Sequence, residues 1–531
     1  MELFPWPWCF YMLLLLILLP ALVLLLVLQC HPTPRRYSAP GTGTRLPPGP
    51  WRLPVIGSLH HLLATNNPRL VHRALADLAR RWDAPVMYLR LGELHFAVVS
   101  SADAAREVVR EHDANFATRA VTATVAATVG DKVGIVLSPH GATWRRLRRI
   151  CAAELLSARR VRSFRPVREH EAARLAATVA AAAAAAGERR YQLVNVSEVA
   201  SRFVSDTVLR AIMGERFRWR DEFVAALEKA MERGAEFGAA DLFPSSRLLR
   251  AINYGAVRES MALNAKLFEL VDRAIDQRRE RKAGLDAAQD GDCLLDVLLR
   301  LQEHDDDPDC PLTMATVKAV ILDMFGTGSS TTSTTIQWAM LELMKNPKVM
   351  RKVQLEIRHA MGCRSRVTED DLINLKYLKL VIKETLRLHP ATSVLFPKAS
   401  QECCKVLGYD VPKGMLMIMN AWAINRDPKY WDDAEVFKPE RFEGSTVDFR
   451  GTDFQFLPFG AGRRMCPGMT LAHANIELAL ATLLYHFDWQ LPPGVTPEEV
   501  DMDEKFGVDV HPKRDVYLSP VIVVTPAEME S

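Results

Sequence analysis

A ten-residue segment, Phe459–Gly468, constrains the fold more than any other part of the chain. It reads FGAGRRMCPG and ends just before a helical stretch that begins near Thr470. A cysteine at the start of a helix lies near unpaired backbone N–H groups and the positive end of the helix dipole, and both favour a thiolate over a thiol. The glycines let the backbone fold closely around the sulfur. The segment therefore predicts that Cys466 is a thiolate with a chemical role.

The rest of the composition excludes several classes of protein. No C-x-x-C pair occurs, so the usual zinc spacings are absent, and nine cysteines in 531 residues do not make a disulfide scaffold. Lys and Arg number 67 against 64 for Asp and Glu, and this near-neutral balance gives no electrostatic footprint for nucleic acid. The sequence also has no phosphate-binding loop, zincin helix or nucleophile elbow. Electrons for any redox chemistry must therefore come from outside the chain.

The chain begins with an apolar run, Trp8–Leu28, of about 21 residues without a charge, which is long enough to span a bilayer as a helix. Pro20 can kink such a helix without ending it. Arg35, Arg36 and Arg45 follow, so the positive-inside rule places the rest of the chain in the cytosol. A cleaved signal peptide is the alternative, but the run exceeds the usual apolar core of about 7–15 residues and no clear cleavage site follows.

The remainder of the chain predicts one globular domain. Residues 45–50 read RLPPGP, a stiff proline-rich spacer. No linker typical of a domain boundary follows Trp51, so we expect an anchor at 1–34, a hinge at 35–50 and one domain at 51–531. Helical periodicity dominates from Ala104 to Leu343, which predicts a mainly α fold with small β-sheets. The strand-like runs are Val86–Leu89, His95–Val99, Met415–Met419 and Val521–Val524.

One predicted helix stands out by its length and its weak centre. Thr313 is suited to cap a helix from about Met314 to Met344, which would be roughly 46 Å long and could cross the whole molecule. Its middle, residues 326–332, reads GTGSSTT, and glycines and hydroxyls bend helices and free backbone groups. A ligand packed against the helix would explain this weakness, and a kink that helps packing is the alternative.

The cysteine segment resembles the cysteine-ligand loop of the cytochrome P450 monooxygenases. Phe459, Gly462, Arg464, Cys466 and Gly468 fall on the family pattern F-x-x-G-x-R-x-C-x-G. Further motifs follow in the family's order, and the resemblance extends from Leu46 to about Pro520. They are W-x-x-x-R at Trp144–Arg148, the oxygen-binding helix, E-x-x-R at Glu384–Arg387 and P-E-R-F at Pro439–Phe442. The resemblance implies the cytochrome P450 fold, with residues 51–531 as a haem-thiolate monooxygenase domain.

The resemblance implies that haem b is ligated through its iron by the Cys466 thiolate, in a loop where Phe459 and Gly468 belong to the cofactor site. Four further residues match positions that contact the haem propionates, which need charge-assisted partners. These residues are Trp144, Arg148, Lys398 and Arg464. Lys398 departs from the arginine that is usual in the related plant pattern, and it supplies a charge without the bidentate fork.

Three more residues match the structural triad of the family. Glu384 and Arg387 share a helix face, because they are three positions apart, and Arg441 lies in the P-E-R-F segment. The resemblance implies that these three side chains form an ion-paired network that locks the cysteine loop.

The oxygen-binding helix departs from the family at one position. The family pattern A/G-G-x-D/E-T-T/S runs here from Thr327 to Thr332 as TGSSTT. The resemblance implies that Gly328 makes room for dioxygen and that Thr331 activates it, but Ser330 replaces the acid of the proton-relaying acid–alcohol pair. Because a hydroxyl can order water and pass protons, Thr331 and Ser330 remain the expected catalytic pair.

The family fold also implies where a substrate would bind. The expected pocket walls are Arg119–Val133, Ala319–Thr331, Ala391–Phe396 and a closing turn at Phe506–Val510. Val320, Val394, Leu395 and Phe396 in these walls indicate an apolar substrate.

The function implied is insertion of one atom of O2 into an apolar small molecule, with electrons from NADPH through NADPH–cytochrome P450 reductase. Motif details resemble plant microsomal members of specialised metabolism, which implies the endoplasmic reticulum membrane and favours a terpenoid over a phenylpropanoid or amino-acid-derived substrate. Two other functions remain open. One is a haem-thiolate isomerase or dehydratase that does not use O2, supported only by Ser330. The other is a non-catalytic haem- or lipid-binding membrane protein.

Overall fold

The computed structural model describes residues 45–65, 70–130, 134–185, 192–235, 238–284, 293–304, 310–362 and 364–527. The predicted membrane helix Trp8–Leu28 and residues 35–44 of the predicted hinge lie outside these ranges. Within them, no helix combines the length and the apolar character needed to cross a bilayer.

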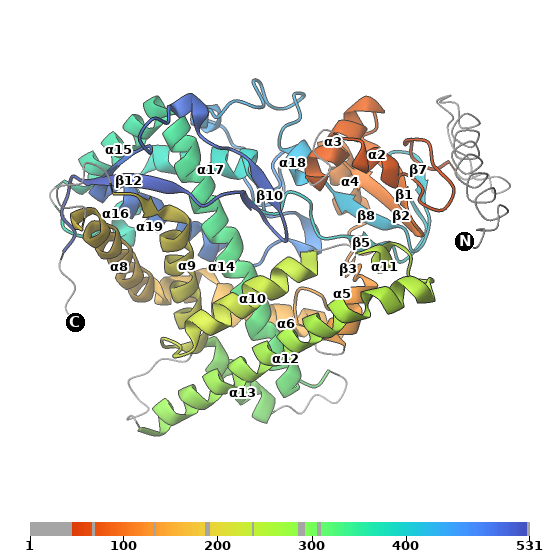
Figure 1. Ribbon diagram of the computed structural model, residues 1–531, viewed down its shortest axis with the longest axis horizontal. Coiled ribbons are helices and arrows are strands. Elements are labelled where there is room, and N and C mark those ends of the chain that lie inside the picture. Colours follow the sequence, from red (N-terminus) through yellow and green to blue (C-terminus); the bar gives the residue numbers. More distant parts are fainter. Residues whose placement is uncertain are drawn as a thin grey trace, which may run out of the picture.

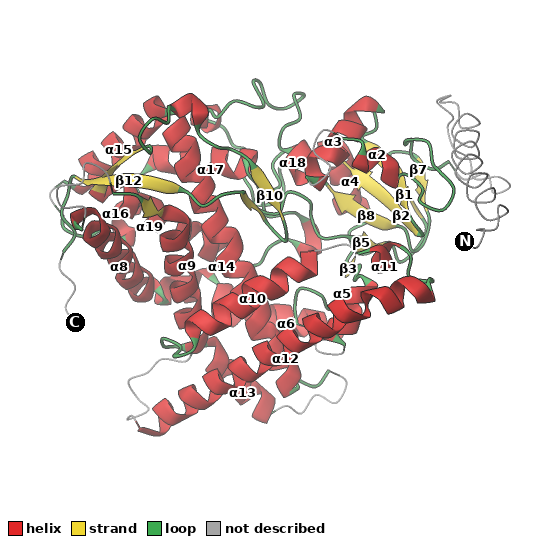
Figure 2. Ribbon diagram, viewed as in Figure 1, coloured by secondary structure: helices red, strands yellow, loops and turns green. Residues whose placement is uncertain are grey.

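Helices make up most of the molecule, and small sheets lie between and beside them (Figure 2). The predicted mainly α fold with small β-sheets is therefore confirmed. One lobe is built from short helices and a five-stranded sheet, and a larger helical lobe lies beside it (Figure 1). The helices of the larger lobe are α6 (Ala142–Cys151), α7 (Ala158–Ser163), α8 (Arg165–Ala184), α9 (Val196–Met213), α10 (Arg220–Ala235), α12 (Arg247–Gly284), α13 (Leu294–Glu303), α14 (Met314–Lys345), α15 (Pro347–Met361), α16 (Glu369–Leu372), α17 (Lys376–Leu388) and α19 (Met469–His486).

The smaller lobe contains the five-stranded sheet, whose strand order is β1-β2-β8-β5-β3. The strands are β1 (Val86–Leu91), β2 (Leu94–Val99), β8 (Leu416–Met419), β5 (Lys398–Ala399) and β3 (Thr118–Arg119). Strand β2 pairs antiparallel with β1 and parallel with β8, so the sheet joins segments far apart in the sequence. The helices of this part are α2 (Leu59–Leu63), α3 (Val71–Arg81), α4 (Ala102–Glu111), α5 (Ala123–Val129), α11 (Ala239–Leu242) and α18 (Ala421–Ile424).

Three smaller sheets complete the fold. Strand β12 (Tyr517–Ile522) pairs with β4 (Val194–Asn195) and β9 (Phe487–Gln490), and two hairpins are formed by β6 (Cys404–Val406) with β7 (Tyr409–Val411) and by β10 (Glu504–Phe506) with β11 (Val510–Pro512). Three of the four predicted strand-like runs coincide with β1, β2 and β8. The fourth, Val521–Val524, is placed too late, because pairing with β4 and β9 starts the strand at Tyr517.

The long helix predicted from Met314 to Met344 is confirmed as α14, which runs through the middle of the molecule (Figure 1). The Thr313 side chain caps it by accepting a hydrogen bond from the Thr316 N–H at 3.1 Å. The weak centre stays helical because its hydroxyls donate to carbonyls one turn earlier. Thr327 donates to Asp323 and Thr331 to Thr327, each at 2.7 Å. Helix α14 is therefore unbroken, and neighbouring elements pack against different sides of it.

Candidate functional site

The loop before α19 closes on itself around Cys466. The Cys466 N–H donates to the carbonyl of Phe459 and the Met465 N–H to that of Gly462, both at 3.0 Å. Gly460 and Gly462 have φ of 68° and 74°, a region that favours glycine. This backbone fold holds Cys466 directly before the first turn of α19.

A neighbouring carboxylate fixes the outer side of the same loop. The Arg463 N–H donates to Asp113 Oδ2 at 3.0 Å, and a Cβ at Gly462 would collide with the same carboxylate. Gly468 is less constrained, because a Cβ there would meet Cys466 Sγ only at 3.9 Å, an ordinary contact. Phe459 packs its ring edge-on against Phe449 at 5.4 Å between centroids, so its side chain anchors the loop to the core.

Burial dominates the electrostatics of the Cys466 sulfur. It raises the pKa of the thiol, while the backbone N–H groups of Gly468 and Met469 and the charge of Arg148 lower that pKa by less. The start of α19 alone therefore does not secure the thiolate, contrary to the expectation from the sequence. A bound metal cation would secure it, because coordination deprotonates a thiol.

Trp144, Arg148 and Arg464 lie together beside the loop. The guanidinium carbon of Arg464 lies 4.2 Å from the centroid of the Trp144 ring and that of Arg148 lies 5.6 Å from it. Arg148 Nη2 also donates to the carbonyl of Met465 at 2.8 Å. Helix α6, which carries Trp144 and Arg148, is thereby attached to the cysteine loop.

Two further cations come from the five-stranded sheet. Lys398 on β5 pairs with Arg119 on β3; Lys398 is buried, and Arg119 is partly buried. Burial, together with the neighbouring cations, lowers the pKa of Arg119 to about 9 and that of Lys398 to about 8. Arg119 is absent from the residues predicted to bind the cofactor, since no local motif marks it. Only the pairing of β3 with β5 brings it to Lys398.

The four cations Arg119, Arg148, Lys398 and Arg464 lack balancing carboxylates. Within the described ranges, none of them has an acidic side chain at ion-pair distance, and Arg119 Nε is buried without an acceptor. Buried charge without a partner is costly. A dianionic group next to Cys466 would supply the missing charge. The residues therefore fit haem b, with a sulfur ligand for its iron and cations for its two propionates.

Glu384, Arg387 and Arg441 meet in a buried network. Arg387 Nε and Nη2 donate to the two oxygens of Glu384 at 2.8 and 2.9 Å, and Arg441 Nε donates to Glu384 at 2.9 Å. Arg387 Nη1 donates to the carbonyl of Asn425, whose own side chain accepts from the Leu457 N–H at 2.9 Å. The network thus connects α17 with the segment that leads to the cysteine loop, and its role in locking that loop stays a prediction.

The predicted catalytic pair lies on α14 with the two hydroxyls turned apart. Thr331 donates to the carbonyl of Thr327, while Ser330 donates to a carboxylate on another element. A Cβ at Gly328 would lie 3.7 Å from Val208 on α9, an ordinary contact, so packing against α9 does not by itself require a glycine there. Its role in making room for dioxygen stays a prediction.

The carboxylate beside Ser330 belongs to Asp509, which no sequence pattern identifies as functional. Asp509 lies in the turn between β10 and β11, and its Oδ2 accepts from Ser330 Oγ at 2.8 Å and from Thr334 Oγ1 at 2.6 Å. The position falls inside the predicted closing turn Phe506–Val510. Its partners are 179 and 175 residues away in the sequence, so only the folded chain reveals the contact.

The predicted pocket walls are in contact with one another. Arg119 donates to the carbonyl of Phe396 at 3.0 Å, and the Val510 N–H donates to the carbonyl of Ala391 at 2.8 Å. The contact between Ser330 and Asp509 joins the α14 wall to the closing turn. Residues 131–133 of the first wall lie outside the described ranges.

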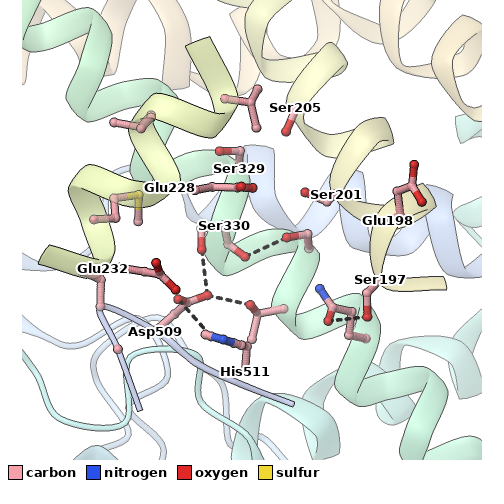
Figure 3. Close-up of a pocket in the computed structure, with 18 of the residues that line it drawn as sticks. Ser197, Glu198, Ser201, Ser205, Glu228, Glu232, Ser329, Ser330, Asp509 and His511 are labelled. Carbon is pink, nitrogen blue, oxygen red and sulfur yellow. Dashed lines mark hydrogen bonds and ion pairs between the residues drawn. The ribbon is translucent and has the colours of Figure 1, made fainter. Parts of the chain in front are cut away.

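A separate polar cavity of about 980 Å³ lies between α9, α10, α14 and the β10–β11 hairpin (Figure 3). Ser330 and Asp509 are on its wall, whereas Thr331 and Cys466 are not. The cavity and the cysteine loop are therefore reached from different faces of α14.

Comparison with known proteins agrees with this geometry. The family model described as Cytochrome P450 matches residues 47–518. The chain is 44% identical to an ent-isokaurene C2/C3-hydroxylase and a zealexin A1 synthase, from Oryza sativa subsp. japonica and Zea mays, over 91% of this chain and 93% of each relative. It is also 44% identical to a desmethyl-deoxy-podophyllotoxin synthase from Sinopodophyllum hexandrum, over 90% and 92%. Among solved structures, a zebrafish cytochrome P450 with abiraterone superposes with a TM-score of 0.69 at 25% identity, covering 85% of this chain and 98% of that one.

Proposed function

The chain belongs to the cytochrome P450 family, and from that premise we propose that it hydroxylates an apolar terpenoid at the endoplasmic reticulum membrane. The enzyme class itself is a haem-thiolate monooxygenase of plant specialised metabolism, which uses O2 and electrons derived from NADPH. The site is identified by four buried or partly buried cations beside Cys466 that have no carboxylate partner within the described ranges. We propose in addition that the substrate is a terpenoid, that the protein is anchored in the endoplasmic reticulum membrane, and that NADPH–cytochrome P450 reductase donates the electrons.

The residues at the site divide the work of holding the cofactor. Cys466 Sγ would hold the iron, and Arg119, Arg148, Lys398 and Arg464 would neutralise the propionates. When bound, the haem supplies the chemistry that splits dioxygen. The protein then has to position the substrate and to exclude water. The ring of Trp144, which both Arg148 and Arg464 contact, would keep these two cations in place.

An apolar substrate is supported by the walls and by the relatives. Val394, Leu395 and Phe396 are partly buried and so keep some apolar surface accessible, whereas Val320 packs wholly into the core. Relatives named ent-isokaurene C2/C3-hydroxylase, ent-cassadiene hydroxylase and germacrene A hydroxylase support a terpenoid. Equal identity to the desmethyl-deoxy-podophyllotoxin synthase keeps a non-terpenoid scaffold as the second candidate.

The apolar run near the N-terminus supports membrane anchoring, and the exposed arginines of α6 support the choice of electron donor. The run Trp8–Leu28 supports an anchor at 1–34, a hinge at 35–50 and a cytosolic catalytic domain at 51–531. Arg145 and Arg149 are exposed on α6, on the helix whose Arg148 contacts the cysteine loop. These charges suit the acidic surface of NADPH–cytochrome P450 reductase docking close to Cys466.

Turnover in microsomes tests the proposal. The full chain is expressed with NADPH–cytochrome P450 reductase and given a panel that includes ent-isokaurene and germacrene A, with products identified by mass spectrometry. We expect a product one oxygen atom heavier that requires both NADPH and the reductase. Product formed without NADPH would instead identify an isomerase or dehydratase. A non-terpenoid product from a wider panel would replace the substrate class and leave the enzyme class intact.

A further inference from the structure

The β10–β11 turn brings a carboxylate to the place where α14 lacks an acid. Ser330 and Thr334 lie one helical turn apart, so both hydroxyls reach Oδ2 of Asp509, at 2.8 and 2.6 Å. Asp509 is only 6% exposed. The acidic group expected at position 330 is therefore present in space, but on a different segment of the chain.

The backbone of the hairpin fixes this carboxylate independently of the two hydroxyls. Trp338 Nε1 on α14 donates to the carbonyl of Val510 at 2.9 Å, and the Val510 N–H donates to the carbonyl of Ala391 at 2.8 Å. Within the turn, the Gly507 N–H donates to the carbonyl of Asp509 at 3.0 Å. Removing one hydroxyl would consequently leave Asp509 beside α14.

The polar cavity gives Asp509 access to water. Its volume of about 980 Å³ would hold about 30 water molecules at roughly 30 Å³ each. Hydroxyls from two helices line it: Ser197, Ser201 and Ser205 on α9, and Ser329 and Ser333 on α14 (Figure 3). Proton exchange between bulk solvent and Asp509 can therefore pass through ordered water.

Charged groups face Asp509 from several elements. His511 Nδ1 on β11 lies 3.7 Å from Asp509 Oδ1. Lys505 on β10 pairs with Glu232 on α10 at 2.8 Å, and Glu228 lies one turn before Glu232. Helix α14 contributes hydroxyls and the Gln337 amide to the cavity. The other charged residues on its wall are Glu198, Arg202, Arg220, Asp221 and Asp515.

These groups set the ionisation of the carboxyl. Burial alone would raise the pKa of Asp509, but the nearby His511 and the hydrogen bonds from Thr334 and Ser330 outweigh burial and hold the pKa below its usual range. Asp509 is thus an anion near neutral pH that can accept a proton from cavity water. Burial, and then the charge of Glu232, raises the pKa of Glu228. Glu228 is therefore a second carboxyl on the cavity wall that can carry a proton.

Ser330 links this cavity to the face of α14 that carries Thr331. Consecutive residues of a helix point about 100° apart, so Ser330 lies on the cavity wall while Thr331 and Thr327 do not. The Thr331 hydroxyl is turned to the carbonyl of Thr327, back along the same helix. A proton that reaches Ser330 Oγ is one residue from the predicted oxygen-activating threonine.

We propose that Asp509 is the proton-relay carboxylate of this enzyme and takes the place of the acid that Ser330 replaces on α14. The inference rests on the proposed monooxygenase function. An excess proton that arrives from bulk solvent through the cavity water binds Asp509, Asp509 passes that proton to Ser330 Oγ, and Ser330 releases its own hydroxyl proton to a water beside Thr331. At each oxygen one O–H bond forms and one breaks, no electrons move, and Asp509 returns to its carboxylate.

Coupling of electron use to product tests the relay. Asp509→Asn keeps an acceptor oxygen for both hydroxyls but cannot carry the proton. With the panel substrate that the wild type oxidises, we expect product per NADPH to fall by about tenfold or more, with a matching rise in hydrogen peroxide. Thr334→Ala, the matched control, removes one hydrogen bond that lowers the pKa of Asp509 but leaves the carboxyl and its contact with Ser330 in place, so coupling should fall far less than in Asp509→Asn. Adding Ser330→Asp to Asp509→Asn should restore coupling.

A second readout needs no turnover. In infrared difference spectra between the wild type and Asp509→Asn, the band of the protonated carboxyl at low pH should shift within seconds of dilution into D2O. A shift that takes hours would show that Asp509 does not exchange protons with the cavity water, and it would overturn the relay. The melting temperature of Asp509→Asn should stay close to that of the wild type.

The outcomes separate this inference from the function on which it rests. Wild-type coupling in Asp509→Asn overturns the relay and leaves the monooxygenase intact. Equal losses of coupling and melting temperature in Asp509→Asn and Thr334→Ala would make Asp509 a structural contact only, which also overturns it. A wild type that consumes no NADPH with reductase contradicts the proposed function itself.

Discussion

At the scale of single residues, the buried cations around the cysteine loop connect sequence and chemistry. Arg148, Lys398 and Arg464 lie in recognisable motifs and could be predicted. Arg119 could not, because its neighbours in the sequence give no sign that β3 pairs with β5. The same holds for Asp509, whose hydroxyl partners are on α14. Local motifs reveal residues that act through their sequence neighbours, whereas long-range pairings need the folded chain.

Replacing Arg119 tests the propionate site. Arg119→Gln removes one buried charge, and we expect haem affinity to fall by about 10- to 100-fold, as for loss of one charged hydrogen bond of about 1.5–3 kcal/mol. The measurement is haem titration of the purified variant followed by absorbance. Arg463→Gln is the control, because its side chain is 53% exposed and lies by Asp113. Equal affinity in both variants and the wild type would show that Arg119 does not hold the cofactor.

At the scale of elements, the β10–β11 hairpin connects the two lobes. Asp509 attaches its turn to α14, and Glu504 attaches its first strand to α3. Glu504 Oε2 accepts from Arg73 Nε at 2.7 Å and lies 2.9 Å from His72 Nε2. Because the Glu504 side chain is only 2% exposed, this contact is protected from solvent screening.

Acid should weaken the attachment of the hairpin to α3. Burial raises the pKa of Glu504, but the hydrogen bonds from His72 and Arg73 outweigh it and lower the pKa to about 2. The ionised carboxylate therefore stabilises the fold fully above about pH 4.5, and this stabilisation is lost as the pH falls toward 2. Burial lowers the pKa of His72, so its protonation also destabilises the fold in acid.

Glu504→Gln should remove about 3 kcal/mol of stability at pH 7. It should also flatten the fall in stability between about pH 4.5 and pH 2. Urea unfolding at a series of pH values measures both effects. An acid limb as steep in the variant as in the wild type would assign the acid sensitivity to other groups.

The Glu384 network predicts a second stability effect. Glu384→Gln leaves Arg387 and Arg441 without their shared anion, and breaking a buried pair costs about 3–5 kcal/mol. We expect a large drop in the urea midpoint together with loss of bound haem. Glu259→Gln is the control, since Glu259 also joins two cations, Lys229 and Arg233, but is 40% exposed. A similar drop in both variants would show that the burial of Glu384 does not increase its contribution to stability.

The elements themselves could be predicted where their signals are local. Helix α14 begins where Thr313 caps it and ends within one residue of the expected position. The two-residue strands β3 and β5 escaped prediction because no periodicity can show in so short a segment. Strand β12 was placed too late for another reason, because its start is set by long-range pairing with β4.

At the scale of the whole molecule, the order of motifs was the most informative feature of the sequence. It predicted the family and the mainly α fold, and both are confirmed. Spatial arrangement was harder to predict, because the central sheet pairs β2 with β8 across more than half the chain. Relatives named as hydroxylases and monooxygenases favour a monooxygenase over the isomerase alternative.

Deleting residues 1–34 tests the anchor. We expect the shortened chain to leave the membrane fraction on ultracentrifugation while it still binds haem, because Cys466 and the four cations proposed to hold the haem all lie after residue 50. A chain that keeps the first 34 residues but has Leu14, Leu15 and Leu16 changed to Asp should behave in the same way. Retention of the shortened chain on membranes in high salt would place the membrane contact elsewhere.

The absorbance spectrum of the reduced, carbon-monoxide-bound full chain tests the central claim most directly. We expect the red-shifted Soret band of thiolate ligation in the wild type and in Cys403→Ala, a control at an exposed cysteine. Cys466→Ala should lose that band. A wild type that stays colourless after haem supplementation, or a Cys466→Ala variant that keeps the thiolate band, would contradict the account.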